Sequence, residues 1–207
     1  SVANGKITRN TAFKNVYVPS AGHDAGISMG AAMYVHHQLL NGKRMSPVFS
    51  AYLGPSFTNE AIEQFLSAEG MQWRRLADDE LFDVVASALA AGKVVGWFSG
   101  RAEFGPRALG NRSILAAPQD AYAAENLNAF IKHREASRKF AASVPAELAS
   151  KYFEAGANAR HLATVSRVRP EYREQFKGAV LANDLVRVHT VAKEDNPLYW
   201  RLLHEFG

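Results

Sequence analysis

Three arginines, Arg101, Arg107 and Arg112, lie within a stretch of twelve residues that is rich in glycine and proline. A guanidinium group is always charged, and its planar fork matches the oxygens of a phosphate or a carboxylate. The glycines of the stretch would let the backbone approach a ligand closely. Because a hydrophobic strand precedes this arginine loop (residues 100–118), we predict a pocket for an anion, with a solvated surface turn as the alternative.

Polar residues of the same loop could complete such a pocket. Glu103 could orient one guanidinium group through a bidentate pair and leave the others for the ligand. Asn111 and Ser113 supply neutral hydrogen bonds to the same region.

Two further sources of positive charge lie later in the chain. Residues 132–139 are strongly basic, with Lys132, Arg134 and Arg138 at a spacing that suits an extended segment. Such runs usually form a solvated face, but these residues could also join the arginine loop around a polyphosphate. Arg187, on a predicted late strand, could reach the same site or form a salt bridge.

The pair His23-Asp24 stands between glycines just before a predicted helix. An imidazole and a carboxylate suit a metal ion. One pair offers too few ligands for a metal cage, so capping of the helix by Asp24 is the alternative that the spacing favours.

Composition limits the classes of protein. A chain of 207 residues with 47% hydrophobic residues predicts one large domain or two small ones. Its apolar runs are too short to span a membrane, no signal peptide is visible, and the absence of cysteine excludes disulfides and cysteine nucleophiles. These features are compatible with the cytoplasm, and the net charge of +4 suits small anions as well as nucleic acid. We find no serine triad, Walker loop or dinucleotide fingerprint.

Periodicity and capping residues predict the elements that would position these side chains. Helices are expected at 27–40, at 59–69 after the cap Thr58, from a cap at Asp78 or Asp79 to 91, at 120–132, 145–153 and 197–206. Strands are expected at 13–18, 94–98, 114–116, 140–144, 164–168 and 185–191. This mixture predicts an α/β or α+β fold, with the best domain boundary in residues 43–57.

The arginine loop also carries a resemblance to a known family. Residues 100–116 are similar, almost letter for letter, to the signature of the nodulation-type O-carbamoyltransferases. Residues 20–26 resemble an Asp-Ala-Gly segment of that family, and residues 52–56 resemble the junction that follows it. The resemblance covers nearly the whole chain and is densest at 94–144.

The resemblance implies a division into two domains. Residues 1–42 look like the last piece of an actin/hexokinase-like transferase domain, 43–57 like a linker, and 58–207 like a YrdC-like domain truncated at its C-terminus. A YrdC-like domain is a twisted mixed sheet with flanking helices. In the family it activates carbamoyl phosphate with ATP to give carbamoyl-adenylate, and the carbamoyl group then passes to a hydroxyl and leaves AMP.

The resemblance also implies roles for single residues. Arg101, Arg107 and Arg112 are the expected catalytic arginines that bind phosphates, and Asp24 matches a metal-binding aspartate. The expected substrate-binding or ATP-binding residues are Glu103, Asn111, Ser113, Lys132, Arg134 and Arg187. A divalent metal, Fe or Mg, is expected only in a complete protein, because the family's histidine ligands lie upstream of this chain.

Departures from the family pattern keep other functions open. The chain looks like a fragment truncated at both ends, so it could be inactive alone or complete its site with a partner chain or a second copy. A basic YrdC-like RNA-binding module is the other alternative. It is disfavoured because base-stacking aromatic residues are not interleaved with the basic clusters.

Overall fold

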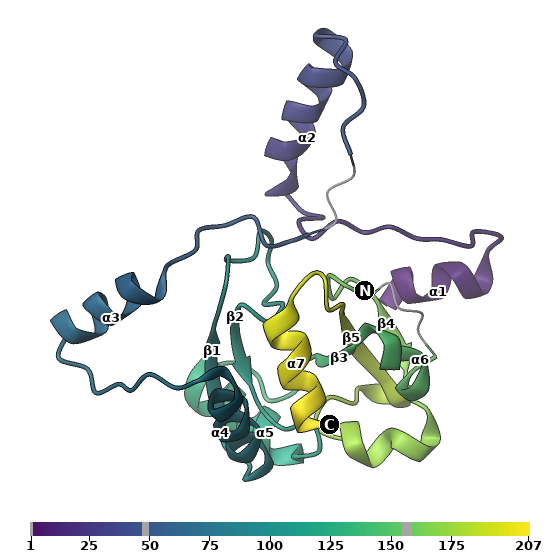
Figure 1. Cartoon of the computed structure of the whole chain (residues 1–207). Helices are drawn as coiled ribbons and strands as arrows, with labels where there is room; N and C mark the ends of the chain where they lie inside the picture. Colours follow the sequence, from purple (N-terminus) through teal and green to yellow (C-terminus); the bar gives the residue numbers. More distant parts are fainter. Residues whose placement is uncertain (1, 47–49, 155–158) are drawn as a thin grey trace.

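The computed structural model describes residues 2–46, 50–154 and 159–207, and it has an α+β fold with two small sheets in this part of the chain. Strands β1 (Val95–Phe98) and β2 (Arg112–Leu115) form an antiparallel ribbon. The other sheet has the order β3 (Ala142–Pro145), β5 (Leu185–Val191), β4 (Val165–Arg167). Helix α7 (Pro197–Phe206) lies beside both sheets, as Figure 1 shows.

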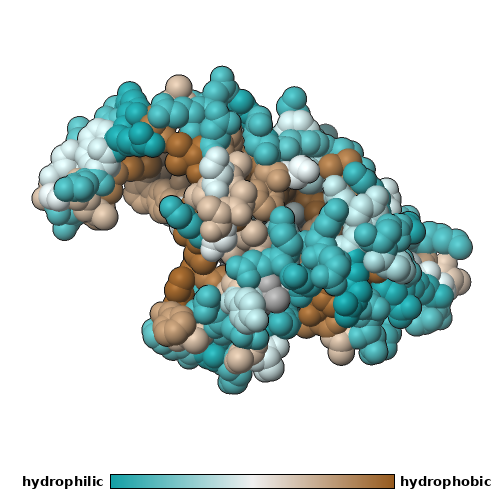
Figure 2. All heavy atoms as spheres, turned by 90° about the horizontal axis from the view of Figure 1, so that it is seen from below, coloured by the Kyte–Doolittle hydropathy of each residue, from teal (hydrophilic) through white to brown (hydrophobic). Residues whose placement is uncertain are grey.

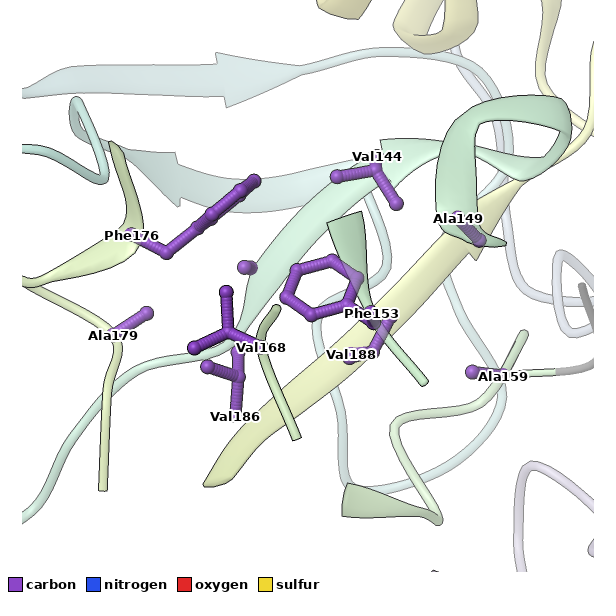
Figure 3. Packing of buried hydrophobic residues seen from close by; sticks show 10 residues of the cluster. Val144, Ala149, Phe153, Ala159, Val168, Phe176, Ala179, Val186 and Val188 are labelled. Carbon is purple, nitrogen blue, oxygen red and sulfur yellow. The ribbon is translucent and has the colours of Figure 1, made fainter. Parts of the chain in front are cut away.

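Strand β5 is the centre of the larger sheet. It pairs parallel with β3 and antiparallel with β4, so both of its edges are occupied. Val186 and Val188 are fully buried, and they pack with Phe153, Val168 and Phe176 in the cluster seen in Figure 3. A strand rich in β-branched residues fits this position because such side chains pack well on a pleated surface.

A second hydrophobic core joins the β1–β2 ribbon to two helices. Helix α4 (Asp78–Ala90) buries Phe82, Val85 and Leu89, which lie on one face at helical spacing. These residues pack with Trp97 of β1 and Leu202 of α7. The helix pair α4–α7 therefore supports the ribbon whose connecting loop carries Arg101 and Arg107 and whose second strand begins at Arg112.

Several short elements lie along the chain after β2. They are α5 (Ala121–Asn126) with its π-helical continuation Leu127–Lys132, the 3₁₀ turn Ala146–Leu148 with α6 (Ala149–Tyr152), and the 3₁₀ turns Pro170–Phe176 and Ala182–Asp184.

Helix α1 (Val2–Asn10), which the sequence did not predict, lies against the outer edge of the larger sheet. The Asn4 amide donates to the carbonyl of Ala163 at 2.8 Å, and Arg9 pairs with Glu154 at 2.5 Å. Gly5 lies so close to the carbonyl of Val165 that a side chain would not fit. This contact covers an edge strand, which would otherwise present unpaired backbone groups.

Two helices extend from the body of the molecule (Figure 1). Helix α2 (Gly26–Tyr34), with its π-helical end Val35–Leu39, and helix α3 (Asn59–Ala68) bury none of their residues. Ile27, Leu39 and Phe65 are each more than 60% exposed. Figure 2 shows hydrophobic surface between hydrophilic areas on the face seen from below.

The structure corrects three of the predicted local features. Residues 13–18 are not a strand: the segment pairs with no neighbouring strand among the described residues, and alternation alone does not make a sheet. Helix α4 begins after Ala77 without a side-chain cap, while Asp78 and Asp79 lie in its first turn. The cap position of α2 is Ala25 rather than Asp24. By contrast, the Thr58 cap, strand 185–191 and helix 197–206 are confirmed.

Candidate anion-binding site

The arginine loop connects the paired ends of β1 and β2, where Phe98 lies opposite Arg112. Gly105 and Gly110 both have positive φ angles, of 132° and 96°. A Cβ at Gly110 would overlap the ring of Tyr199, and one at Gly105 would lie 2.6 Å from the carbonyl oxygen of Ser20. Glycine is therefore required at these two positions both by conformation and by space.

Glu103 organises the interior of the loop. One of its carboxylate oxygens accepts backbone N–H groups of Leu109 at 2.7 Å, Asn111 at 2.9 Å and Arg112 at 3.2 Å. The carboxylate is thus taken up by backbone donors rather than by the guanidinium group expected from the sequence. Hydrogen bonds from backbone amides to a charged acceptor are among the stronger ones in proteins, so Glu103 fixes the shape of the loop.

Arg101 and Arg112 direct their guanidinium groups at backbone carbonyls. Arg101 donates to Gly54 at 3.0 Å and Leu53 at 2.9 Å. Arg112 donates to the carbonyl of Ser99 at 2.7 Å, and its guanidinium carbon lies 3.6 Å from the centroid of the Phe98 ring. Both side chains therefore serve the loop and its surroundings in this structure.

Arg107 and Arg134, from two separate segments, both lie near enough to Arg187 for their charges to act on it. Arg107 belongs to the loop, Arg134 follows the helix that ends at Lys132, and Arg187 lies on β5. Burial lowers the pKa of Arg187, and the positive charges of Arg107 and Arg134 lower it further. Arg107 and Arg134 are therefore both near enough to Arg187 for their charges to act on it, while a common polyphosphate site for the basic segment and the arginine loop stays a prediction.

Arg187 has an unused donor, whereas Arg134 is held by its neighbours. The Nε of Arg187 is buried and has no hydrogen-bond partner in the described part of the chain. Arg134 is held in place, since its Nε donates to Asn128 at 2.7 Å and its guanidinium carbon lies 4.8 Å from the centroid of the Phe140 ring. Three cations with a buried, unpaired N–H group form an environment that an anion would stabilise.

The remaining predicted binding residues have different surroundings. Asn111 is buried and its amide donates to the carbonyl of Arg101 at 2.7 Å, while the Ser113 hydroxyl accepts from the N–H of Gly110 at 2.9 Å. Both shape the loop. Lys132 is exposed at the end of its helix.

Asp24 and His23 are exposed in the turn before α2. Among the residues that the structure describes, no three or more His, Asp or Glu side chains are grouped so that they could hold a metal ion. Protein metal sites usually take three or more protein ligands, so these two residues do not fit a metal by themselves.

A buried polar network behind the loop was not predicted. The Tyr52 hydroxyl donates to the carbonyl of Leu109 at 2.8 Å, and burial raises the pKa of Tyr52 to about 12. The Asn196 amide donates to the Tyr52 hydroxyl at 3.3 Å and to the Asn111 side-chain oxygen at 2.8 Å. Asn196 precedes Pro197 at the start of α7, and an Asn-Pro pair is a helix-start signal that could have drawn attention to it.

None of the described helices is long and apolar enough to cross a membrane.

Comparison with known proteins places the chain in a family. Residues 86–207 match the family model for the carbamoyltransferase C-terminus. A Synechocystis protein designated sll1178 is 41% identical over 99% of this chain and 38% of its own length. Nodulation protein NolO of Bradyrhizobium diazoefficiens is 38% identical over 98% of the chain and 38% of its length. The 3'-hydroxymethylcephem-O-carbamoyltransferase of Streptomyces clavuligerus is 30% identical over 94% of the chain and 35% of its length.

The match covers more than half of the chain and includes the whole arginine loop, β5 and the three arginines 107, 134 and 187. The chain therefore belongs to the carbamoyltransferase family, as its resemblance predicted. It spans a little over a third of the length of these three relatives.

Proposed function

We propose that this chain is the carbamoyl-phosphate-activating part of an ATP-dependent O-carbamoyltransferase. In this function, carbamoyl phosphate, ATP and water give carbamoyl-adenylate, inorganic phosphate and pyrophosphate. A hydroxyl oxygen of an acceptor then attacks the carbamoyl carbon, and the bond from that carbon to AMP breaks. Two relatives support the choice of reaction class, because their names describe carbamoyl transfer to the oxygen of a cephem.

The observation that carries the proposal is the buried Nε of Arg187, which has no hydrogen-bond partner among the described residues, with the charges of Arg107 and Arg134 near enough to lower the pKa of Arg187. Carbamoyl phosphate and ATP are both polyanions, so bringing them together requires fixed positive charge. Guanidinium groups that are already in place stabilise developing negative charge without reorganising, which is why preorganised donors contribute strongly to catalysis. In this proposal Arg107, Arg134 and Arg187 contact the phosphates, while Arg101, Arg112 and Glu103 hold the loop.

The finer domain assignment is also a proposal. We take residues 1–42 as a remnant of an actin/hexokinase-like domain, 43–57 as a linker and 58–207 as the YrdC-like domain. The family match supports the last part, and the apolar, unburied α2 is consistent with a helix that belongs to another unit. Asp24 would contribute to an Fe or Mg site only with ligands from outside this chain, and the acceptor would bind there. Cytoplasmic location stays a prediction.

Binding measurements test the proposal. We expect isothermal titration calorimetry to detect carbamoyl phosphate and ATP binding to the chain. Arg107→Ala and Arg187→Ala should each weaken that affinity roughly 10- to 100-fold, because each removes a charge-assisted hydrogen bond worth about 1.5–3 kcal/mol.

Arg169→Ala is the matched control. Arg169 donates to a backbone carbonyl, that of Ser150, at 3.1 Å and carries the same charge. The Arg169→Ala variant should bind carbamoyl phosphate and ATP with the affinity of the wild type. Unchanged affinity in both Arg107→Ala and Arg187→Ala would refute the assignment of the phosphate site.

A further inference from the structure

Residues 51–55 lie along the first half of the arginine loop and are fastened to it by backbone hydrogen bonds. The N–H of Gly54 donates to the carbonyl of Ala102 at 2.9 Å, and the N–H of Phe104 donates to the carbonyl of Ala51 at 2.6 Å. A Cβ at Gly54 would lie only 2.8 Å from the Cβ of Ala102, so the two backbones are in close contact. We call residues 51–55 the clamp segment.

Two side chains strengthen this attachment from opposite directions. Arg101 reaches from the loop to the clamp segment, where its fork spans the carbonyls of Leu53 and Gly54. Tyr52 reaches from the clamp segment to the loop, where its hydroxyl binds the carbonyl of Leu109. Ala51 and Leu109 also share a small buried cluster.

These attachments lie on both sides of Arg107 in the sequence. Before it, Arg101 and Ala102 are bound to the clamp segment. After it, Leu109 is held through its carbonyl by Tyr52 and through its N–H by Glu103. Arg107 itself is exposed, in a loop that contains three glycines with positive φ. Such a loop would lose much conformational entropy on binding an anion if nothing held it beforehand.

We propose that Arg101 and Tyr52 are positioning residues, which hold the clamp segment against the loop and thereby place Arg107 in the anion site. The proposal rests on the proposed function, since it takes Arg107 as a ligand of the substrate phosphates. In this role Arg101 acts by its shape as well as its charge, because its guanidinium group must donate to two carbonyl oxygens at once. Because coupling is reciprocal, a bound anion should also tighten the clamp segment.

The test combines carbamoyl phosphate titration with amide hydrogen exchange on the full chain. Arg101→Ala and Tyr52→Phe should each weaken binding about tenfold, which corresponds to about 1.4 kcal/mol, or one ordinary hydrogen bond. Amide exchange at Leu109, Asn111 and Arg112 should become about tenfold faster in the free variants. In the wild type, carbamoyl phosphate should slow exchange at Gly54.

Arg101→Lys separates position from charge. A lysine keeps the positive charge but cannot span both carbonyls, so we expect it to lose about as much affinity as Arg101→Ala. Arg169→Ala, which removes a guanidinium group from another backbone carbonyl, should change neither affinity nor loop exchange.

The outcomes separate this inference from the proposed function. If the wild type binds and Arg101→Lys also binds normally while Arg101→Ala does not, Arg101 acts by charge and the positioning role is wrong. If both Arg101→Ala and Tyr52→Phe bind normally, the role is likewise wrong and the proposed function stands. If the wild type binds neither carbamoyl phosphate nor ATP, the proposed function fails. The positioning role is then tested by amide exchange alone. Exchange rates at Leu109, Asn111 and Arg112 that are the same in the free variants as in the free wild type would show that it is wrong.

Discussion

Burial lowers the pKa of two side chains on the same face of β5, but only one of them loses its charge. His189 is fully buried, and burial, with a smaller effect of His161, lowers its pKa to about 3, so it is neutral at pH 7. Arg187, two residues earlier, cannot give up its proton because the pKa of a guanidinium group is too high. It therefore keeps its charge beside Arg107 and Arg134. A side chain that became neutral when buried near other positive charges, as a histidine does, could not offer an anion a constant positive charge.

The neutral state of His189 makes stability depend on pH. Its folded pKa lies below the unfolded value of 6.5, so below pH 6.5 the unfolded chain binds a proton that the folded chain does not. Stability from this residue is fully present above pH 6.5 and falls by up to about 1.4 kcal/mol per pH unit as the pH drops toward 3.

Urea denaturation between pH 7 and pH 5 measures this effect. We compare the wild type with His189→Asn, which does not titrate in this range. The variant starts from a lower stability, because it leaves Ser143 without its 3.0 Å partner and leaves a cavity, but its pH slope should be shallower. Equal slopes in the two proteins would show that His189 is not the source.

At the scale of elements, sequence reasoning succeeded where a local signal and the tertiary structure agree. Helix α7 and strand β5 lie where periodicity and capping predicted them, since each buries the side chains that make its pattern. Helix α1 was missed because it has no buried residue and is held by contacts with residues far along the chain, such as Glu154 and Ala163. The parallel pairing of β3 with β5 was also beyond prediction, because it joins residues more than forty positions apart.

The same distinction applies to the candidate site. Arginines 107, 134 and 187 were recognisable as candidates by residue type, and the loop glycines were recognisable by spacing. That Arg101 binds the carbonyls of Leu53 and Gly54 depends on where residues 51–55 cross the loop. Nothing near Arg101 in the sequence encodes that crossing.

The caps of α7 and α3 provide a comparison between a helix that packs and one that does not. Asn196→Ala should lower the free energy of unfolding by about 2–3 kcal/mol. It removes the bond from the Tyr199 N–H, and it leaves the buried Asn111 side-chain oxygen without that donor.

Thr58→Ala is the matched control, because Thr58 likewise accepts from a backbone N–H, that of Ala61 at 3.2 Å. Helix α3 buries no residues, so fraying of its end should change global stability by less than about 0.5 kcal/mol. Chemical denaturation of both variants measures the difference, and a loss of similar size in the two would contradict the ranking.

For the whole molecule, the structure combines a packed body with two helices that contribute little to it. The body contains both hydrophobic cores and the candidate anion site, while α2 and α3 extend from it (Figure 1). Isolated helices of nine or ten residues are marginal in water. Their apolar residues, such as Ile27 and Phe65, are therefore surface that another part of a larger protein could cover.

Native-state hydrogen exchange should distinguish the packed body from the two extended helices by their amide exchange rates. Amides of β5 and α7 should exchange only through global unfolding, whereas those of α2 and α3 should exchange at least about 100-fold faster through local opening. Mass spectrometry of the exchanged chain measures this at peptide resolution. Equal protection of α2 and β5 at low protein concentration would mean that α2 is not free in solution.

The central place of β5 also affects how the protein emerges from the ribosome. Strand β5 spans residues 185–191 and is therefore made after β3 and β4, but it is the strand that joins them into one sheet. Ribosomes add roughly 5–20 residues per second, so several seconds pass between the synthesis of β3 and that of β5, and the larger sheet cannot form during that time. During that interval Val144, Phe153 and Val168 lack the valines that cover them, and the nascent chain is exposed to aggregation. Arg187, which belongs to the candidate anion site, is made with the same strand, so translation completes the sheet and the candidate site together.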